Sequence, residues 1–111
     1  MKRIHLFHAI VAGLLLSLIA CSSEDPKFRI YNERADKANI QIQTSGGNTI
    51  NINDVAAGQT TAYQSVAQGT VVVTAVIQNV SASPTAKFFC GKDEQYTIVV
   101  QAGTVPTLRV D

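Results

Sequence analysis

From Phe28 to the end of the chain, apolar and polar residues alternate in short runs. Ile40 and Ile42 are separated by polar residues, and Ile50 and Ile52 repeat the pattern after a Gly-Gly turn. Because successive side chains of a strand point to opposite faces, this alternation predicts half-buried β-strands. No long stretch has the spacing of an amphipathic helix. This part of the chain is therefore predicted to be all-β.

The alternating runs, with turn signals between them, predict seven or eight strands. These strands are Phe28–Glu33, Ala38–Gln43, Thr49–Asn53, Thr60–Val66, Gly69–Gln78, Thr85–Cys90, Glu94–Gln101 and Thr107–Val110. The longest run, Gly69–Gln78, is apolar on both faces near its start, which predicts a central, covered strand. Short strands at this spacing are typical of a small antiparallel Ig-like sandwich. Its expected inward residues are Ile40, Ile42, Val71, Val73, Phe88, Ile98 and Val100.

The N-terminus follows a different pattern. Lys2 and Arg3 precede an uncharged apolar run from Ala9 to Ala20. As a helix, this run would be about 18 Å long, whereas the hydrocarbon core of a bilayer is ~30 Å thick. The short run and its basic flank therefore predict an export signal, residues 1–20, instead of a membrane-spanning helix.

The last three residues of the signal and the cysteine after them read Leu18-Ile19-Ala20-Cys21. This sequence resembles the lipobox of bacterial lipoproteins. The resemblance implies cleavage between Ala20 and Cys21, a diacylglycerol thioether on Cys21, and a fatty acid such as palmitate on its new amine. Such a protein is held on a membrane of the cell envelope. Ser22 favours the periplasmic face of the outer membrane in an organism that has one. The alternative is an ordinary export signal that contains a cysteine.

Residues 21–27 form a short polar tether between the lipidated cysteine and the β-sandwich domain, residues 28–111. Six residues from Ser22 to Lys27 reach about 20 Å at full extension. We therefore expect a domain held flat and close to the membrane surface.

The β part resembles a family of bacterial secreted and surface domains of unknown function with an Ig-like sandwich. The resemblance lies in Phe28-Arg29-Ile30-Tyr31-Asn32, Ile40-Gln41-Ile42, Val55-Ala56-Ala57-Gly58 before Tyr63, Gly69-Thr70-Val71-Val72-Val73, and Gly91-Lys92 before Tyr96-Thr97-Ile98-Val99. Two extra residues between Lys92 and Tyr96 imply a longer turn than the family has. A looser similarity is to the periplasmic accessory proteins of alginate O-acetylation. Neither resemblance implies catalytic residues.

Charge and composition exclude several functions. From Cys21 onward there are seven Lys and Arg against eight Asp and Glu, so a nucleic acid is not an expected partner. Both histidines, His5 and His8, lie in the signal, and Cys90 is the one cysteine after Cys21. Without a histidine to activate a nucleophile or a cysteine cluster to bind zinc, we expect no catalysis, metal or cofactor. Cys90 is expected to be either buried or cross-linked to a partner.

These observations predict a non-catalytic structural or binding module whose partner is an envelope protein or a glycan. The alternative is an accessory or carbohydrate-binding subunit in exopolysaccharide modification. Three tyrosines, Tyr31, Tyr63 and Tyr96, are the candidate surface-binding residues. Exposed aromatic rings in one plane would favour a glycan, and tyrosines packed inward would oppose it.

Overall fold

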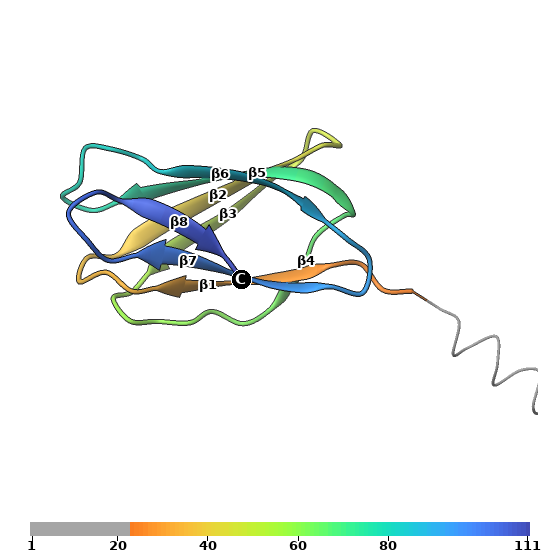
Figure 1. Cartoon of the computed structure of the whole chain (residues 1–111), viewed down its shortest axis with the longest axis horizontal. Helices are drawn as coiled ribbons and strands as arrows, with labels where there is room; N and C mark the ends of the chain where they lie inside the picture. Colours follow the sequence, from red (N-terminus) through yellow and green to blue (C-terminus); the bar gives the residue numbers. More distant parts are fainter. Residues whose placement is uncertain (1–22) are drawn as a thin grey trace, which may run out of the picture.

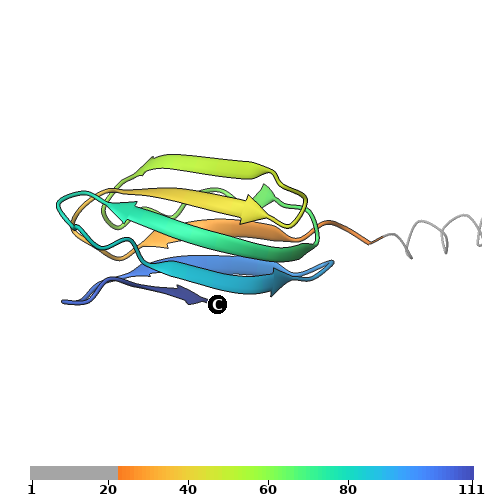
Figure 2. The same cartoon turned by 90° about the horizontal axis from the view of Figure 1, so that it is seen from above.

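The computed structural model describes residues 23–111, which form eight strands and no helix. The strands are β1 (Lys27–Asn32), β2 (Ala38–Thr44), β3 (Thr49–Val55), β4 (Gln64–Ser65), β5 (Gly69–Ile77), β6 (Thr85–Cys90), β7 (Gln95–Gln101) and β8 (Thr107–Val110). They form two four-stranded sheets in two layers (Figure 1). The β1 sheet has the order β4-β1-β7-β8, and the β2 sheet has the order β3-β2-β5-β6. Strands of both layers run along a common long axis (Figure 2).

The predicted small all-β sandwich is confirmed, and its strand number is eight. Neighbouring strands pair antiparallel, with the exception of β1 and β7, which pair parallel from Lys27 and Gln95 to Asn32 and Val100. A parallel pair needs a long connection, and the chain from β2 to β6 supplies it. Because β8 pairs with β7, the first and last strands of the domain lie in the same sheet.

Inward side chains of both sheets form one apolar core. Of the residues predicted to face inward, Ile40, Ile42, Val71, Val73, Ile98 and Val100 are buried, and Phe88 is half-buried and packs against them. Burying one such aliphatic side chain contributes about 1.5–3 kcal/mol. β5 is central, as predicted, but its outward face remains partly exposed, with Val76 53% exposed, because the described chain has no third layer.

The predicted strand Thr60–Val66 is interrupted: Gln64–Ser65 pair with β1 as β4, and Thr60 forms an isolated antiparallel bridge with Tyr31. The Thr61 side chain explains the interruption, because its Oγ1 accepts the Ile30 N–H at 2.9 Å. This hydroxyl takes the place of a backbone carbonyl in the ladder. An interrupted edge is a poorer template for pairing with another chain.

β3 extends two residues further than predicted because it contains a β-bulge. Ala38 pairs with Val55, whereas Ile40 pairs with Ile52, so β3 carries one more residue than β2 between these pairs. Asp54 sits in the bulge with a φ of 57°, and its N–H donates to Asn39 Oδ1 at 2.7 Å. The extra residue reverses the alternation. Val55 therefore points into the core instead of out of it.

The segment before β1, predicted as part of a tether, is packed against the domain. Pro26 is buried, and its carbonyl accepts the Val66 N–H at 2.9 Å. The Glu24 N–H donates to Asp93 Oδ1 at 2.7 Å, and the Asp93 N–H donates to the Glu24 carbonyl at 2.9 Å. Proline suits this buried edge position because it has no N–H that needs a partner.

Candidate binding surfaces

The three candidate tyrosines lie in two different environments. Tyr31 points outward from β1, between inward-facing Ile30 and Asn32, and is half-buried. Tyr63 is 41% exposed, and Arg29 stacks over its ring at 4.8 Å from the centroid. These two tyrosines therefore share the outer face of the β1 sheet.

Tyr96 instead packs towards the core. Its ring lies 5.3 Å from the ring of Phe88, centroid to centroid. Its hydroxyl accepts the Gly91 N–H at 2.9 Å and donates to the Phe89 carbonyl at 3.3 Å. A tyrosine whose ring is packed and whose hydroxyl is bonded closes the end of the sandwich. The structure thus brings Tyr31 and Tyr63 to one surface and places Tyr96 apart from them.

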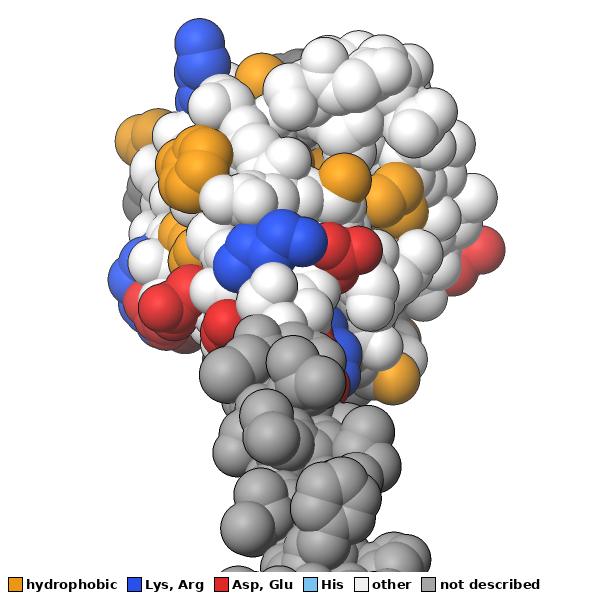
Figure 3. All heavy atoms as spheres, turned by 90° about the vertical axis from the view of Figure 1, so that its right-hand side faces the viewer, with side chains coloured by type: hydrophobic (Ala, Val, Ile, Leu, Met, Phe, Trp, Pro, Cys, Tyr) orange, Lys and Arg blue, Asp and Glu red, His pale blue; other side chains and the backbone are white. Residues whose placement is uncertain are grey.

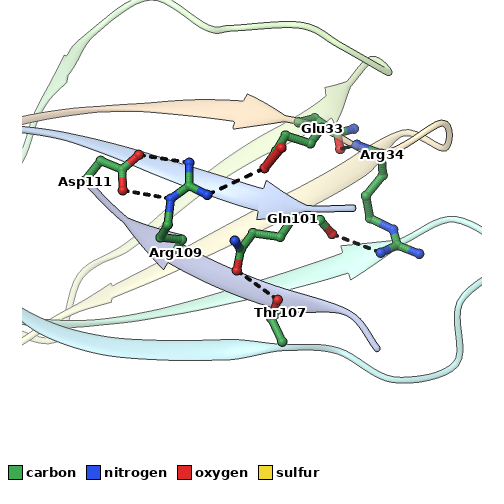
Figure 4. A network of polar contacts seen from close by, with 7 residues as sticks. Glu33, Arg34, Gln101, Thr107, Arg109 and Asp111 are labelled. Atoms are coloured by element: carbon green, nitrogen blue, oxygen red, sulfur yellow. Dashed lines mark hydrogen bonds and ion pairs between the residues drawn. The ribbon is translucent and has the colours of Figure 1, made fainter. Parts of the chain in front are cut away.

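The outer face of the β1 sheet carries a charged network towards β8 (Figure 4). Arg109 Nε and Nη2 donate to the two carboxylate oxygens of Asp111 at 2.8 and 3.1 Å, and Arg109 Nη1 lies 4.0 Å from Glu33 Oε1. Hydrogen bonding to Arg109 lowers the pKa of the Asp111 carboxyl, and Asp111 raises the pKa of Arg109 in return. Val99 lies between Tyr31 and Arg109 in the strand register and is buried beneath this face. The charged side chains of this face therefore already contact one another, which leaves less of the face open to a partner.

The loops at the end of β1 are tied down by polar side chains. Asn32 is buried and donates from Nδ2 to the Asp36 carbonyl at 2.8 Å and the Val55 carbonyl at 3.1 Å. Arg34 Nη1 donates to the Gln101 carbonyl at 3.0 Å (Figure 4). It also donates to the Gly103 carbonyl at 3.1 Å. Three loops from different parts of the chain are thus held in one arrangement at this end of the sandwich.

The outer face of the β2 sheet has a different character, and we call it the amide face. One row across its four strands pairs Asn51 with Gln41, Gln41 with Thr74, and Thr74 with Thr85. Adjacent strands are about 4.8 Å apart, so this row spans about 14 Å. Asn39, Gln43 and Thr49 extend the same chemistry, and Lys87 and Phe89 border it on β6. The amide face offers uncharged donors and acceptors on a broad, exposed sheet surface.

The carboxylates in the loops that follow β1 and precede β7 do not converge. Glu33 and Asp36 follow β1, whereas Asp93 and Glu94 precede β7. Since β1 and β7 run parallel and in register, the two pairs lie at opposite ends of the sandwich. Residues 23–111 contain no group of carboxylate, cysteine or histidine side chains arranged to hold a metal ion, and they enclose no pocket.

Cys90 is buried, with 1% of its surface exposed, as one of the two sequence interpretations proposed. Burial raises the pKa of its thiol. A buried, protonated thiol is a poor nucleophile and a poor partner for a disulfide with another chain. Cys90 therefore belongs to the core.

Two features of these surfaces were missed from the sequence. Alternation indicates that the Asn and Gln residues of β2 and β3 face solvent, but their alignment with Thr74 and Thr85 depends on the strand order. The burial of Asn32, the last residue of the Phe28-Arg29-Ile30-Tyr31-Asn32 run, was not predicted. Its position at an inward-facing site of β1, after Phe28 and Ile30, was the available signal of a buried polar residue.

The predicted signal cleavage between Ala20 and Cys21 and the lipid attachment at Cys21 lie outside the described residues. Across residues 23–111, no helix is long and apolar enough to span a membrane.

Comparisons with known proteins inform the fold. No family model and no curated protein matches this chain. A solved structure described as an NMR structure of a protein from Eubacterium rectale is similar, with a TM-score of 0.59 and 18% identity. The match covers 81% of this chain and 89% of that protein. A likeness at this level of identity supports the sandwich fold and carries no function with it.

Proposed function

We propose that this protein is a lipid-anchored, non-catalytic binding module of the bacterial cell envelope. The anchor is Cys21, exposed as the first residue when the signal is removed after Ala20, and an outer-membrane position facing the periplasm suits Ser22. The domain binds an envelope partner through an outer sheet surface.

The amide face is the observation that carries the binding role. Its exposed Asn, Gln and Thr side chains come from β2, β3 and β6, half-buried Thr74 of β5 lies between them, and its central row carries no charged residue. Hydrogen-bonding groups on a rigid sheet lose little conformational freedom when a partner binds. The carboxylates of the loops beside β1 and β7, by contrast, lie at opposite ends of the domain and support no shared chemistry.

The anchor is tested by fatty-acid labelling of the full chain in cells. Replacing Cys21→Ser should abolish incorporation of labelled palmitate and leave the precursor uncleaved, because a hydroxyl does not form the thioether. Cys90→Ala is the matched control and should be labelled normally, since Cys90 is buried in the folded domain. Labelled lipid on the Cys21→Ser chain would refute the anchor.

The binding surface is tested by photo-crosslinking in intact cells. A crosslinking residue at Gln41, on the amide face, should give a discrete adduct. The same residue at exposed Thr107, on the outer face of the β1 sheet, serves as the matched comparison. Adducts from Thr107 and none from Gln41 would move the binding surface to the β1 sheet, and no adduct from either site would count against a binding role.

A second candidate function, glycan binding, is favoured by the same amide face. Asn, Gln and Thr side chains match the hydroxyl groups of a neutral polysaccharide without requiring a charge on it. The tyrosines support this less well, because Tyr96 packs inward and Arg29 covers part of Tyr63. In this reading the protein is an accessory or carbohydrate-binding subunit in exopolysaccharide modification.

Affinity electrophoresis in gels that contain a neutral exopolysaccharide tests this candidate. The chain should be retarded, and the double variant Gln41→Ala with Asn51→Ala should migrate faster. Thr107→Ala is the control on the opposite sheet and should remain retarded. Equal mobility in gels with and without polysaccharide would reject glycan binding and leave a protein partner.

A further inference from the structure

The attachment of residues 24–26 to the domain restricts how the sandwich can stand on an anchor. Backbone and side-chain hydrogen bonds join Glu24 and Asp93 in both directions, at 2.7 and 2.9 Å. Lys92 Nζ also lies 3.2 Å from Asp25 Oδ1. The chain is therefore fixed to the body of the domain from Glu24 onward, and we call this set of contacts the clamp.

The fixed segment continues the line of β1. The bond from the Val66 N–H to the Pro26 carbonyl extends the antiparallel register of Lys27 with Ser65 by one residue. In Figures 1 and 2 the segment leaves the sandwich along the strand axis. It leaves at the end formed by the turns 44–48 and 91–94 and the loop 66–68, which we call the tether end.

Chain length then sets the distance from the anchor. Three residue steps separate Cys21 from Glu24, which allows about 10 Å at 3.3–3.6 Å per residue. The nine residues of β5 run from the tether end to the opposite end. At ~3.4 Å per residue, the opposite end lies about 27 Å further along the axis.

The tether end carries four carboxylates and two lysines, namely Glu24, Asp25, Asp93, Glu94, Lys27 and Lys92. Lys27 Nζ lies 3.6 Å from Glu24 Oε2, Lys92 pairs with Asp25, and the Asp93 carboxylate accepts a backbone N–H. Figure 3 looks directly at this end, where basic and acidic side chains lie close together and hydrophobic ones are scattered. Such a surface offers no basic patch that would bind anionic headgroups by itself, so its contact with lipid depends on the anchor.

We infer that the tether end abuts the lipid surface and that the strands point away from the membrane. The amide face and the loops held by Asn32 and Arg34 are then displayed away from the lipid. This inference rests on the proposed anchor at Cys21. This upright orientation replaces the flat placement expected from tether length alone. The clamp fixes the tether from Glu24 onward, so only a short free segment remains between Cys21 and the domain.

The orientation is tested with the lipidated full chain in vesicles that carry a nitroxide on their headgroups. A fluorophore is attached at Gln68→Cys near the tether end or at Ser81→Cys near the opposite end, both exposed positions. Gln41→Cys and Thr107→Cys report on the two sheet faces. Buried Cys90 is protected from the label. Quenching should be several-fold stronger at position 68 than at position 81, with positions 41 and 107 weaker than position 68.

The clamp is tested at Asp93, which has a φ of 64°. Asp93→Gly tolerates this backbone conformation and removes the carboxylate, so the contrast between positions 68 and 81 should shrink. Asp93→Asn keeps an oxygen acceptor and tolerates the same φ, so it should preserve the contrast. An unchanged contrast in Asp93→Gly would overturn the role of the clamp.

The remaining outcomes separate the orientation from the anchor. Quenching at position 41 or 107 that equals quenching at position 68 would show a domain lying flat, and equal quenching at 68 and 81 would show no fixed orientation. Either result overturns this inference and leaves the anchor intact. Mass spectrometry of the mature N-terminal peptide reports the anchor separately. An unacylated Cys21 would overturn both proposals.

Discussion

Among single residues, Asn32 makes an unusual set of contacts because it is a polar side chain within an apolar core. Its Nδ2 donates to the carbonyls of Asp36 and Val55, and its Oδ1 accepts the Arg34 N–H at 3.0 Å. Each of these backbone groups would otherwise need water or another partner. Asn32 therefore determines the arrangement of two loops at the end opposite the tether end.

Replacing Asn32→Ala should lower the free energy of unfolding by about 2–4 kcal/mol, because it leaves buried backbone groups without partners at ~1–3 kcal/mol each. Urea denaturation followed by circular dichroism measures the change. Asn53→Ala, at an exposed position of β3, is the matched control and should change stability by no more than ~0.5 kcal/mol. Equal midpoints for the two variants would contradict the role of Asn32.

Cys90 should be unreactive in the folded protein. Burial raises the pKa of its thiol, so the reactive thiolate is rare in the native state. Alkylation by iodoacetamide should be slow in buffer and fast in denaturant, as measured by mass spectrometry. Rapid alkylation of the native protein would place Cys90 at the surface.

The same pKa shift predicts a dependence of stability on pH. Above the ordinary thiol pKa the unfolded chain loses the Cys90 proton, while the native state retains it until the pH passes the raised value. Because the native state then binds more protons, the free energy of unfolding should fall with rising pH in this window and be unaffected below it. Cys90→Ala should lack this decline in denaturation curves recorded across the alkaline range.

For the elements, strand register decides which side chains reach the core. Ile42 of β2 pairs with Val73 of β5, and the neighbouring pair is Gln41 with Thr74. A shift of one residue would exchange the two rows and bury the amides. The bulge at Asp54 makes such an exchange within β3, which is why Val55 is inward.

Truncating Val73→Ala should cost about 1–3 kcal/mol of unfolding free energy, since Val73 is fully buried and leaves a cavity. Gln41→Ala, on the outward side of the neighbouring strand, should cost no more than ~0.5 kcal/mol. Thermal and urea unfolding of both variants measures the difference. A larger loss for Gln41→Ala would show that the register is reversed.

At the scale of the whole molecule, the strand order separates carboxylates that might otherwise act together. Glu33 and Asp36 lie at one end of the sandwich, and Asp93 and Glu94 lie at the other. The Asp93 carboxylate also accepts the Glu24 N–H as part of the clamp. The proposed function is therefore one of contact between surfaces.

The purified protein should show no hydrolysis across panels of ester, glycoside and peptide substrates, because its carboxylates lie apart and no histidine follows His8. Chromogenic and mass-spectrometric assays measure turnover. An activity that disappears when Glu33, Asp36, Asp93 or Glu94 is neutralised would contradict the proposed function. Activity that persists in all four variants would indicate a contaminating enzyme.

The sequence alone determined the class of this domain, the position of most strands and the inward residues of four of them. Alternation of apolar and polar residues is a local property, because it follows from the two-residue repeat of a strand. For the same reason the turn at Gly46-Gly47 and the inward positions of Ile40, Ile42 and Val73 were predictable.

Tertiary structure decided what depends on partners distant in the chain. The parallel pairing of β1 with β7, the interruption of the edge strand at Thr61 and the burial of Pro26 each depend on hydrogen bonds to residues tens of positions away. The amide face likewise exists only because β3, β2, β5 and β6 lie side by side in that order. Local alternation determines which way a side chain points, but only the packing of strands determines which other side chains lie next to it.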